Sequence, residues 1–341
     1  MQTLDILPLP AGIEDQRHRF REVFSAVRAL HTDWPFDRPV ETALLKRPDE
    51  QPPTGKLVDT GKARSNLHFV ILPGQFADCL SYDISHYNMH DHLQQQGFTV
   101  SVLWVNGRSS CEHNAETIYQ ALREHDNAQP LVFIGYSKGA IDALHAIQLH
   151  PEIRERTAAV VSVAGAVYGS PIATIVPQPI RSLIHKFHLG KCQPGAGRSL
   201  ESLAPALRRQ WLEQYPPPSH IRYFGLAGTP APEVVSRALS LLHRYLGKRY
   251  GANDSLMLYQ DTMLPHSQFL GFVNADHFAI ALPLKKNWYN ARLLFDHNDF
   301  PREILLESVV RYVEEVWLLD TFNTRNNTEN DLLAVEPRSC E

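Results

Sequence analysis

Apolar and polar positions follow one another along most of the chain in short segments that predict strands and helices in turn. Six mostly apolar runs predict strands, at residues 67–72, 99–105, 131–134, 158–163, 221–226 and 269–273. Apolar residues at helical spacing predict helices between and after them, at 84–96, 115–122, 140–149 and 305–316. Strands that alternate with helices imply right-handed crossovers and a parallel arrangement. We therefore expect an α/β fold with a mainly parallel central sheet covered by helices on both faces.

Two segments do not show this alternation of strands and helices. Residues 1–60 combine one amphipathic helix, over Phe20 to Leu30, with prolines that break any long element. They predict a helical, Pro-rich extension that packs on the main domain of residues 61–341, and its last part can contribute early strands. Residues 170–217 are rich in Pro and Gly but also hold apolar clusters. We expect them to form a cap inserted over the carboxyl edge of the sheet.

The composition is that of an ordinary globular protein, with 43% hydrophobic residues, 21% charged residues and a net charge of −4. This balance argues against a nucleic-acid partner. Four scattered cysteines argue against a zinc ribbon or a disulfide-stapled scaffold, and we expect reduced thiols. The first residues carry no signal-peptide pattern, and no apolar run has membrane-spanning length. These features predict a cytoplasmic protein without an integral membrane segment, and they leave the oligomeric state open.

One motif stands at a predicted strand-to-helix junction. Gly135-Tyr136-Ser137-Lys138-Gly139 follows the strand at 131–134 and precedes the helix at 140–149. A serine on such a strained turn projects its hydroxyl above the sheet, where it can attack a substrate. The alternative, a glycine-lined turn with an incidental serine, fits these flanking elements less well. We therefore predict that Ser137 is a nucleophile.

A serine nucleophile requires a base to take its proton and an acid to orient that base. In a fold of this kind the three residues follow in the order serine, acid, histidine. Asp254 lies in Asn253-Asp254-Ser255, between the strands at 221–226 and 269–273, and His277 comes just after the latter strand. We choose Asp254 as the acid and His277 as the base.

Other candidates remain for both roles. Asp261 is the alternative acid, whereas Asp276 precedes the histidine directly and is expected to shape its loop. His266 could be the base only if the strand at 269–273 were misplaced. A group of polar residues on the helix at 84–96 resembles a metal site but lacks a recognised spacing, so we expect ordinary surface side chains at His86, His90, Asp91 and His92.

The oxyanion formed during attack on a carbonyl needs backbone N–H donors. The sequence predicts the amide of Lys138 as one donor. The loop after the strand at 67–72 supplies the other from Gln75 or Phe76, and Gln75 is preferred. The Lys138 side chain could attract anionic substrates or face solvent at the start of its helix, and we expect the second.

With these residues in place, the chain resembles bacterial lipases and esterases of the α/β-hydrolase superfamily. Five matching pieces span about residues 66–320 in the same order as in that superfamily: Leu72-Pro73-Gly74-Gln75-Phe76, Gly135-Tyr136-Ser137-Lys138-Gly139, Gly169-Ser170-Pro171, Asn253-Asp254-Ser255 and Ala275-Asp276-His277-Phe278. The chain departs from the pattern in lacking His-Gly before the oxyanion loop, in carrying Lys138 after the serine, and in having Ser255 where the acid loop has glycine. These departures weaken an assignment to true triglyceride lipases.

The resemblance implies a serine hydrolase that cleaves carboxylic esters through an acyl-enzyme on Ser137. It implies no metal or organic cofactor. The apolar cap suggests a small-molecule ester or acyl substrate of hydrophobic character. Two alternatives stay open at this point: the same residues could serve a thioesterase or acyltransferase, or the chain could be a non-catalytic member of the fold that binds a ligand.

Overall fold

An eight-stranded sheet forms the centre of the computed structural model, which describes residues 6–31, 37–75, 86–124, 128–177, 195, 197–284 and 293–334. The strands lie in the order β1-β8-β7-β6-β5-β3-β4, and β2 pairs with β8 off this path. Their bounds are β1 (Glu14–Asp15), β2 (Leu44–Leu45), β3 (His68–Leu72), β4 (Thr99–Val102), β5 (Leu131–Tyr136), β6 (Thr157–Val163), β7 (Arg222–Gly228) and β8 (Gln268–Val273). Every pair is parallel except β2 with β8. The predicted mainly parallel sheet is confirmed.

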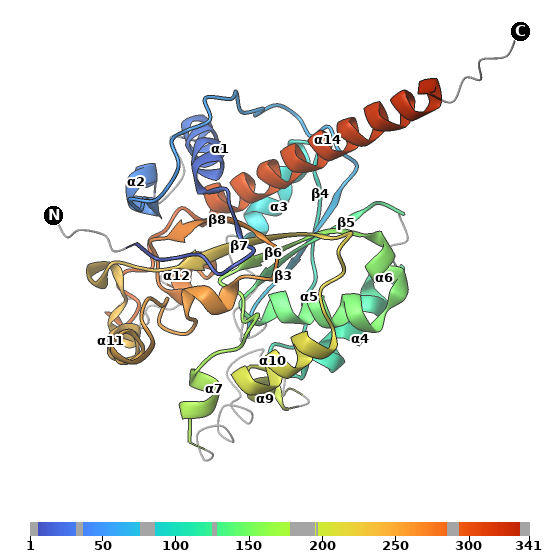
Figure 1. Ribbon diagram of the computed structural model, residues 1–341. Helices are drawn as coiled ribbons and strands as arrows, with labels where there is room; N and C mark the ends of the chain where they lie inside the picture. Colours follow the sequence, from blue (N-terminus) through green and yellow to red (C-terminus); the bar gives the residue numbers. More distant parts are fainter. Residues whose placement is uncertain are drawn as a thin grey trace, which may run out of the picture.

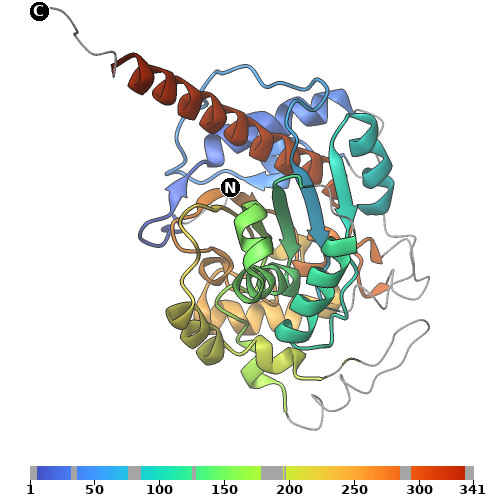
Figure 2. The same cartoon turned by 90° about the vertical axis from the view of Figure 1, so that its right-hand side faces the viewer.

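Helices cover both faces of this sheet (Figures 1 and 2). On one face, α1 (Arg17–Leu30), α3 (His86–Gln95) and α14 (Arg302–Ala334) share a hydrophobic core with the strands. On the other face, a second core joins the strands to α4 (Cys111–Glu124), α5 (Lys138–Leu149), α6 (Pro151–Arg156) and α10 (Pro205–Gln214). All six residues of β5 are buried, because the strand has neighbours on both sides and helices on both faces.

The remaining helical segments are shorter or lie at the edges. They are α2 (Val40–Ala43), α7 (Ile172–Ile175), α9 (Ser199–Ser202), η2 (Pro232–Val234), α11 (Arg237–Tyr250), η3 (Tyr259–Thr262) and α12 (His277–Ala281). The predicted terminal helix at 305–316 is part of the much longer α14, and α11 was not predicted. The strand predicted at 99–105 ends at Val102, although the Leu103 amide still donates to the Ile71 carbonyl.

The N-terminal extension is joined to the main domain through β8. β1 pairs with β8 in parallel and β2 pairs with it antiparallel, so both lie in the central sheet. Helix α1 packs against α14 and buries Phe20, Val23, Phe24 and Val27 in the shared core. Two-residue strands show no periodicity, so the sequence pattern could not locate them.

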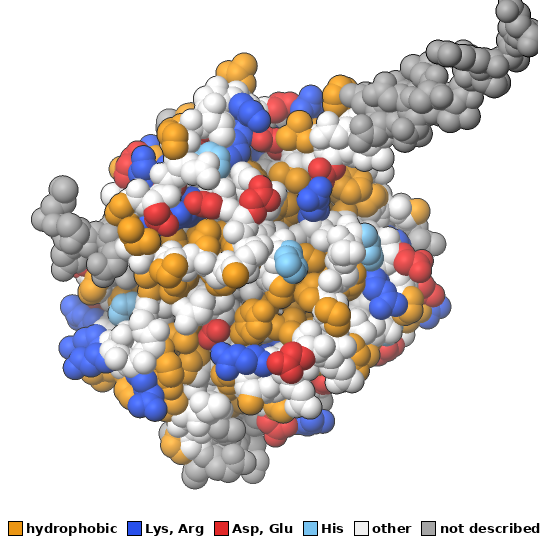
Figure 3. All heavy atoms as spheres, in the orientation of Figure 1, with side chains coloured by type: hydrophobic (Ala, Val, Ile, Leu, Met, Phe, Trp, Pro, Cys, Tyr) orange, Lys and Arg blue, Asp and Glu red, His pale blue; other side chains and the backbone are white. Residues whose placement is uncertain are grey.

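On the face shown in Figure 3, acidic and basic side chains are interspersed over most of the surface, and several basic side chains gather at the lower left, over α11. None of the helices in the described part of the chain is both long and apolar enough to cross a membrane. Cys111 is a buried free thiol. The other three cysteines lie outside the described residues, so the expectation of reduced thiols extends to them only as a prediction.

Candidate active site

Ser137 occupies a sharp turn between β5 and α5. Its φ of 53° and ψ of −119° lie in a region that non-glycine residues rarely adopt. A Cβ at position 135 would lie 2.3 Å from the Ala140 Cα, and one at position 139 would lie 2.1 Å from the Leu72 carbonyl oxygen. Only glycine fits at these two positions, because α5 passes so close to β5 and β3. The glycines of the motif therefore permit the strained turn that holds Ser137 at the carboxyl edge of the sheet.

Ser137, His277 and Asp254 form a continuous hydrogen-bonded chain. The Ser137 Oγ lies 2.9 Å from the His277 Nε2, and the His277 Nδ1 lies 2.7 Å from the Asp254 Oδ2. All three residues are buried. The structure thus brings together the three side chains that the sequence selected, although they are 140 and 23 residues apart in the chain.

Local hydrogen bonds fix the orientation of both partners. The Asp254 Oδ1 accepts the amides of Leu256 (2.9 Å) and Met257 (2.7 Å), which leaves Oδ2 for the histidine. The His277 amide donates to the Asp254 carbonyl (2.8 Å), and the Tyr136 hydroxyl donates to the His277 carbonyl (2.5 Å). Imidazole and carboxylate are consequently held by backbone as well as side-chain contacts.

The competing acids and base lie in other surroundings. Asp276 caps α12 by accepting the Ala279 amide (3.0 Å) and also accepts the Ser236 amide (2.9 Å). Asp261 is buried near Arg209, 4.0 Å away, and burial raises the pKa of its carboxyl to about 6, against the opposing effect of Arg209. His266 precedes β8 whereas His277 follows it, so the two histidines lie at opposite ends of a six-residue strand.

The predicted oxyanion donors lie beside Ser137. Lys138 is the first residue of α5, so its amide has no acceptor within the helix. The Gly74–Gln75 segment passes very close to the serine, because a Cβ at position 74 would lie 2.9 Å from the Ser137 Cβ. Gln75 lines the same pocket as Ser137, and its side chain donates to the Ser199 hydroxyl (3.1 Å). Phe76, the alternative donor, lies outside the described residues.

The expectation for the Lys138 side chain is wrong. The residue is 0% exposed, and its Nζ forms an ion pair with the Asp142 Oδ1 at 2.6 Å. Asn114 donates to the other oxygen of Asp142 (2.8 Å). Burial disfavours the charged amine, but the carboxylate outweighs it and the pKa of Lys138 is raised. The spacing of Lys138 and Asp142, four residues apart on one helix, could have suggested this pair.

A pocket of about 90 Å³ opens beside the serine. Its described walls are mainly apolar and include parts of the segment 170–217, namely Ser170, Ile172, Ala173, Leu200 and Leu203. Leu256, Met257 and Phe278 complete them around Ser137 and His277. A larger cavity of about 610 Å³ lies near the starts of β7 and β8, at the opposite end of the sheet. The predicted reactive groups converge on the smaller pocket.

Comparison with solved structures places this geometry in a family. The crystal structure of the metagenomic carboxyl esterase MGS0156 superposes with a TM-score of 0.85 at 33% sequence identity, and the match covers 92% of this chain and 97% of that one. The chain belongs to the α/β-hydrolase family. A more distant α/β-hydrolase, the Bacillus licheniformis lipase BlEst2 in its propeptide form, shares the fold at 19% identity and a TM-score of 0.51, over 65% of this chain and 48% of that one. No family model and no curated protein sequence matches this α/β-hydrolase.

Proposed function

We propose that this α/β-hydrolase cleaves carboxylic esters through an acyl-enzyme on Ser137. The observation that carries the proposal is the continuous hydrogen-bonded chain from the Ser137 hydroxyl through His277 to the buried Asp254. Its likeness to a carboxyl esterase over almost the whole chain supports an ester as the substrate.

The geometry supports a two-step reaction. His277 takes the hydroxyl proton as the Ser137 Oγ attacks the ester carbonyl carbon, and the carbonyl oxygen becomes an oxyanion held by the amides of Lys138 and Gln75. The intermediate collapses with loss of the alcohol, which receives the proton from His277. A water molecule then gives a proton to His277 and attacks the acyl carbon, and the acid leaves as Ser137 regains its proton. Asp254 orients the imidazole and stabilises its protonated form.

The apolar residues beside Ser137 favour a hydrophobic acyl or alcohol group. Most side chains in the described pocket walls are aliphatic, methionine or phenylalanine side chains, and contact with them removes apolar substrate surface from water. Hydrolysis of p-nitrophenyl esters of increasing chain length will measure this preference. Parallel assays with acyl-CoA, and with added alcohols as acceptors, distinguish ester hydrolysis from thioester cleavage and acyl transfer.

Two matched substitutions test the assignment of the acid. Asp254→Asn removes the carboxylate that orients His277, so kcat should fall by about 10⁴-fold. Asp261→Asn changes a carboxyl that lies near Arg209 instead, and kcat should stay within about twofold of wild type. Loss of activity in the second variant with retention in the first would overturn the assignment of Asp254, provided that circular dichroism shows both variants folded.

A further inference from the structure

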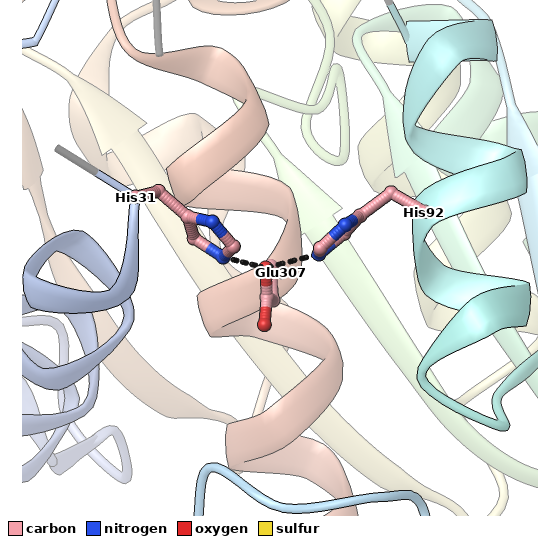
Figure 4. A group of neighbouring side chains, drawn as sticks. All are labelled: His31, His92 and Glu307. Atoms are coloured by element: carbon pink, nitrogen blue, oxygen red, sulfur yellow. Dashed lines mark hydrogen bonds and ion pairs between the residues drawn. The ribbon is translucent and has the colours of Figure 1, made fainter. Parts of the chain in front are cut away.

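A second histidine–carboxylate cluster lies among α1, α3 and α14, the helices that cover one face of the central sheet. His31 follows the last residue of α1, His92 lies in the last turn of α3, and Glu307 lies near the start of α14. Figure 4 shows both imidazoles pointing at the same carboxylate from opposite sides. Each Nε2 lies 2.9 Å from the Glu307 Oε2, and the three ligand atoms lie within 4.8 Å of one another.

The carboxylate at the centre of this cluster is held in place by a fourth residue. Glu307 is fully buried, and its other oxygen, Oε1, accepts a hydrogen bond from the Arg311 Nε at 2.7 Å. Arg311 also donates to the Gly61 carbonyl (2.9 Å), which fixes the guanidinium. The arrangement leaves Oε2 directed at the two histidines. Metal-binding carboxylates commonly have such an outer partner, which orients them.

We propose that His31, His92 and Glu307 bind one divalent transition-metal ion of the Zn²⁺ type. Two imidazole nitrogens and one carboxylate oxygen favour Zn²⁺ over the hard cations Mg²⁺ and Ca²⁺, which take oxygen ligands. Ligand atoms around a tetrahedral Zn²⁺ lie roughly 3.3 Å apart, given bonds of about 2.0–2.1 Å. The two Nε2–Oε2 distances of 2.9 Å approach this spacing. The two Nε2 atoms lie within 4.8 Å of each other, and side-chain rotations that bring them to about 3.3 Å would admit the ion.

This ion would connect three segments that are distant in the sequence. His31 belongs to the N-terminal extension and His92 to the helix after β3, whereas Glu307 belongs to the last helix. Binding to the folded chain alone stabilises it, because the three ligands converge only in the native state. The site takes no part in the proposed ester hydrolysis.

The alternative is a polar cluster in which two neutral histidines donate hydrogen bonds to Glu307 and no metal binds. His31→Gln and His92→Gln separate the two possibilities, because a glutamine amide can still donate to the carboxylate but is a poor metal ligand. His90→Gln is the matched control. His90 lies on the same helix but contacts Asp91 (3.1 Å), whose side chain is 79% exposed.

Equilibrium dialysis of the full chain against Zn²⁺, after removal of bound metal with a chelator, should give one bound ion in wild type and in His90→Gln. Affinity in His31→Gln and His92→Gln should be about 100-fold lower, because a ligand is at least as important as the outer partners whose loss costs about 10–100-fold. Co²⁺ should give the intense visible absorption of a tetrahedral site in wild type and in His90→Gln, and not in His31→Gln or His92→Gln. At a free Zn²⁺ concentration about 100 times Kd, the Tm of wild type should rise by about 3–5 °C.

Wild type that binds no Zn²⁺, or that binds it no more tightly than the two glutamine variants do, would overturn the proposal. Hydrolysis of p-nitrophenyl esters by His92→Gln should remain within about twofold of wild type. The metal site and the proposed esterase activity can therefore fail independently.

Discussion

Two regions of the molecule pair histidine with a buried carboxylate, and they do so in different ways. Asp254 has one oxygen occupied by two backbone amides, so the other holds a single imidazole whose second nitrogen meets the Ser137 hydroxyl. Glu307 has one oxygen occupied by Arg311, and two imidazoles converge on the other. The first arrangement places one imidazole between a hydroxyl and a carboxylate, and the second directs two imidazoles at one carboxylate oxygen. The geometry of the carboxylate's remaining partners, more than residue type, separates the proposed general base from the proposed set of metal ligands.

Substituting one histidine in each region should give the largest contrast. His277→Gln removes the base that takes the Ser137 proton, so kcat should fall by about 10⁴-fold or more. His92→Gln leaves that proton path intact and should change kcat by less than about twofold. Steady-state hydrolysis of a p-nitrophenyl ester measures both. Equal losses of kcat in the two folded variants would contradict the claim that only the region around Ser137 takes part in the reaction.

The buried ion pair beneath the serine should affect stability more than chemistry. Lys138→Met removes the cation that pairs with the buried Asp142 and leaves its charge with neutral hydrogen-bond partners, among them Asn114 and Cys111, which should lower the free energy of unfolding by about 3–5 kcal/mol. The backbone amide of residue 138 is unchanged, so the folded fraction should keep its activity. Urea unfolding of this variant and of Lys138→Met/Asp142→Leu provides the check. The double variant should recover most of the loss, and its failure to do so would argue that the pair is not the cause.

The pH dependence of stability should show the effect of burial on the Asp261 carboxyl. Burial raises its pKa from 3.8 to about 6. The neutral carboxyl is therefore the form that the folded state favours, and the stability linked to it is fully present below about pH 4 and is lost as the pH rises through 6. Asp261→Asn should therefore stabilise the protein at pH 8 by about 3 kcal/mol, and this gain should shrink toward zero between pH 6 and pH 4. Thermal or urea unfolding across this range measures it. A gain that is independent of pH would contradict the assigned cause.

The smallest expected effect concerns the acid loop itself. Ser255 has a φ of 87°, and its buried hydroxyl has no hydrogen-bond partner among the described residues. Ser255→Gly relieves this strain and should raise the free energy of unfolding by about 1 kcal/mol without changing kcat. Ser255→Ala removes the hydroxyl but keeps the strain, so it should gain less. A loss of kcat in the glycine variant would indicate that the strain positions Asp254.

The sequence could predict the region around Ser137 because each of its residues follows a strand. Ser137 comes after β5, Asp254 after β7 and His277 after β8, and the carboxyl ends of parallel strands meet at one edge of a sheet. Strand order along the chain and residue chemistry were therefore enough to select the three side chains. The environment of Lys138 was missed, because burial of a helix's first residue depends on the neighbouring helix α4, which supplies Asn114.

The cluster of His31, His92 and Glu307 could not be predicted from strand order and residue chemistry. His92 and Glu307 lie on two helices and His31 directly follows a third, and no motif specifies how these helices pack. His90 contacts Asp91 on the surface while His92 contacts Glu307, so the two side chains of one predicted group have different surroundings. β1 and β2 could not be predicted for a related reason: strands of two residues are defined only by their pairing with β8.

Labelling with a fluorophosphonate tests the central claim most directly, because such reagents form a covalent bond with an activated serine. The account predicts that the folded wild type gains one adduct, that peptide mapping finds it on Ser137, and that Ser137→Ala abolishes it. A folded wild type that remains unlabelled, or a Ser137→Ala variant that labels equally well, would contradict the claim that Ser137 is the nucleophile.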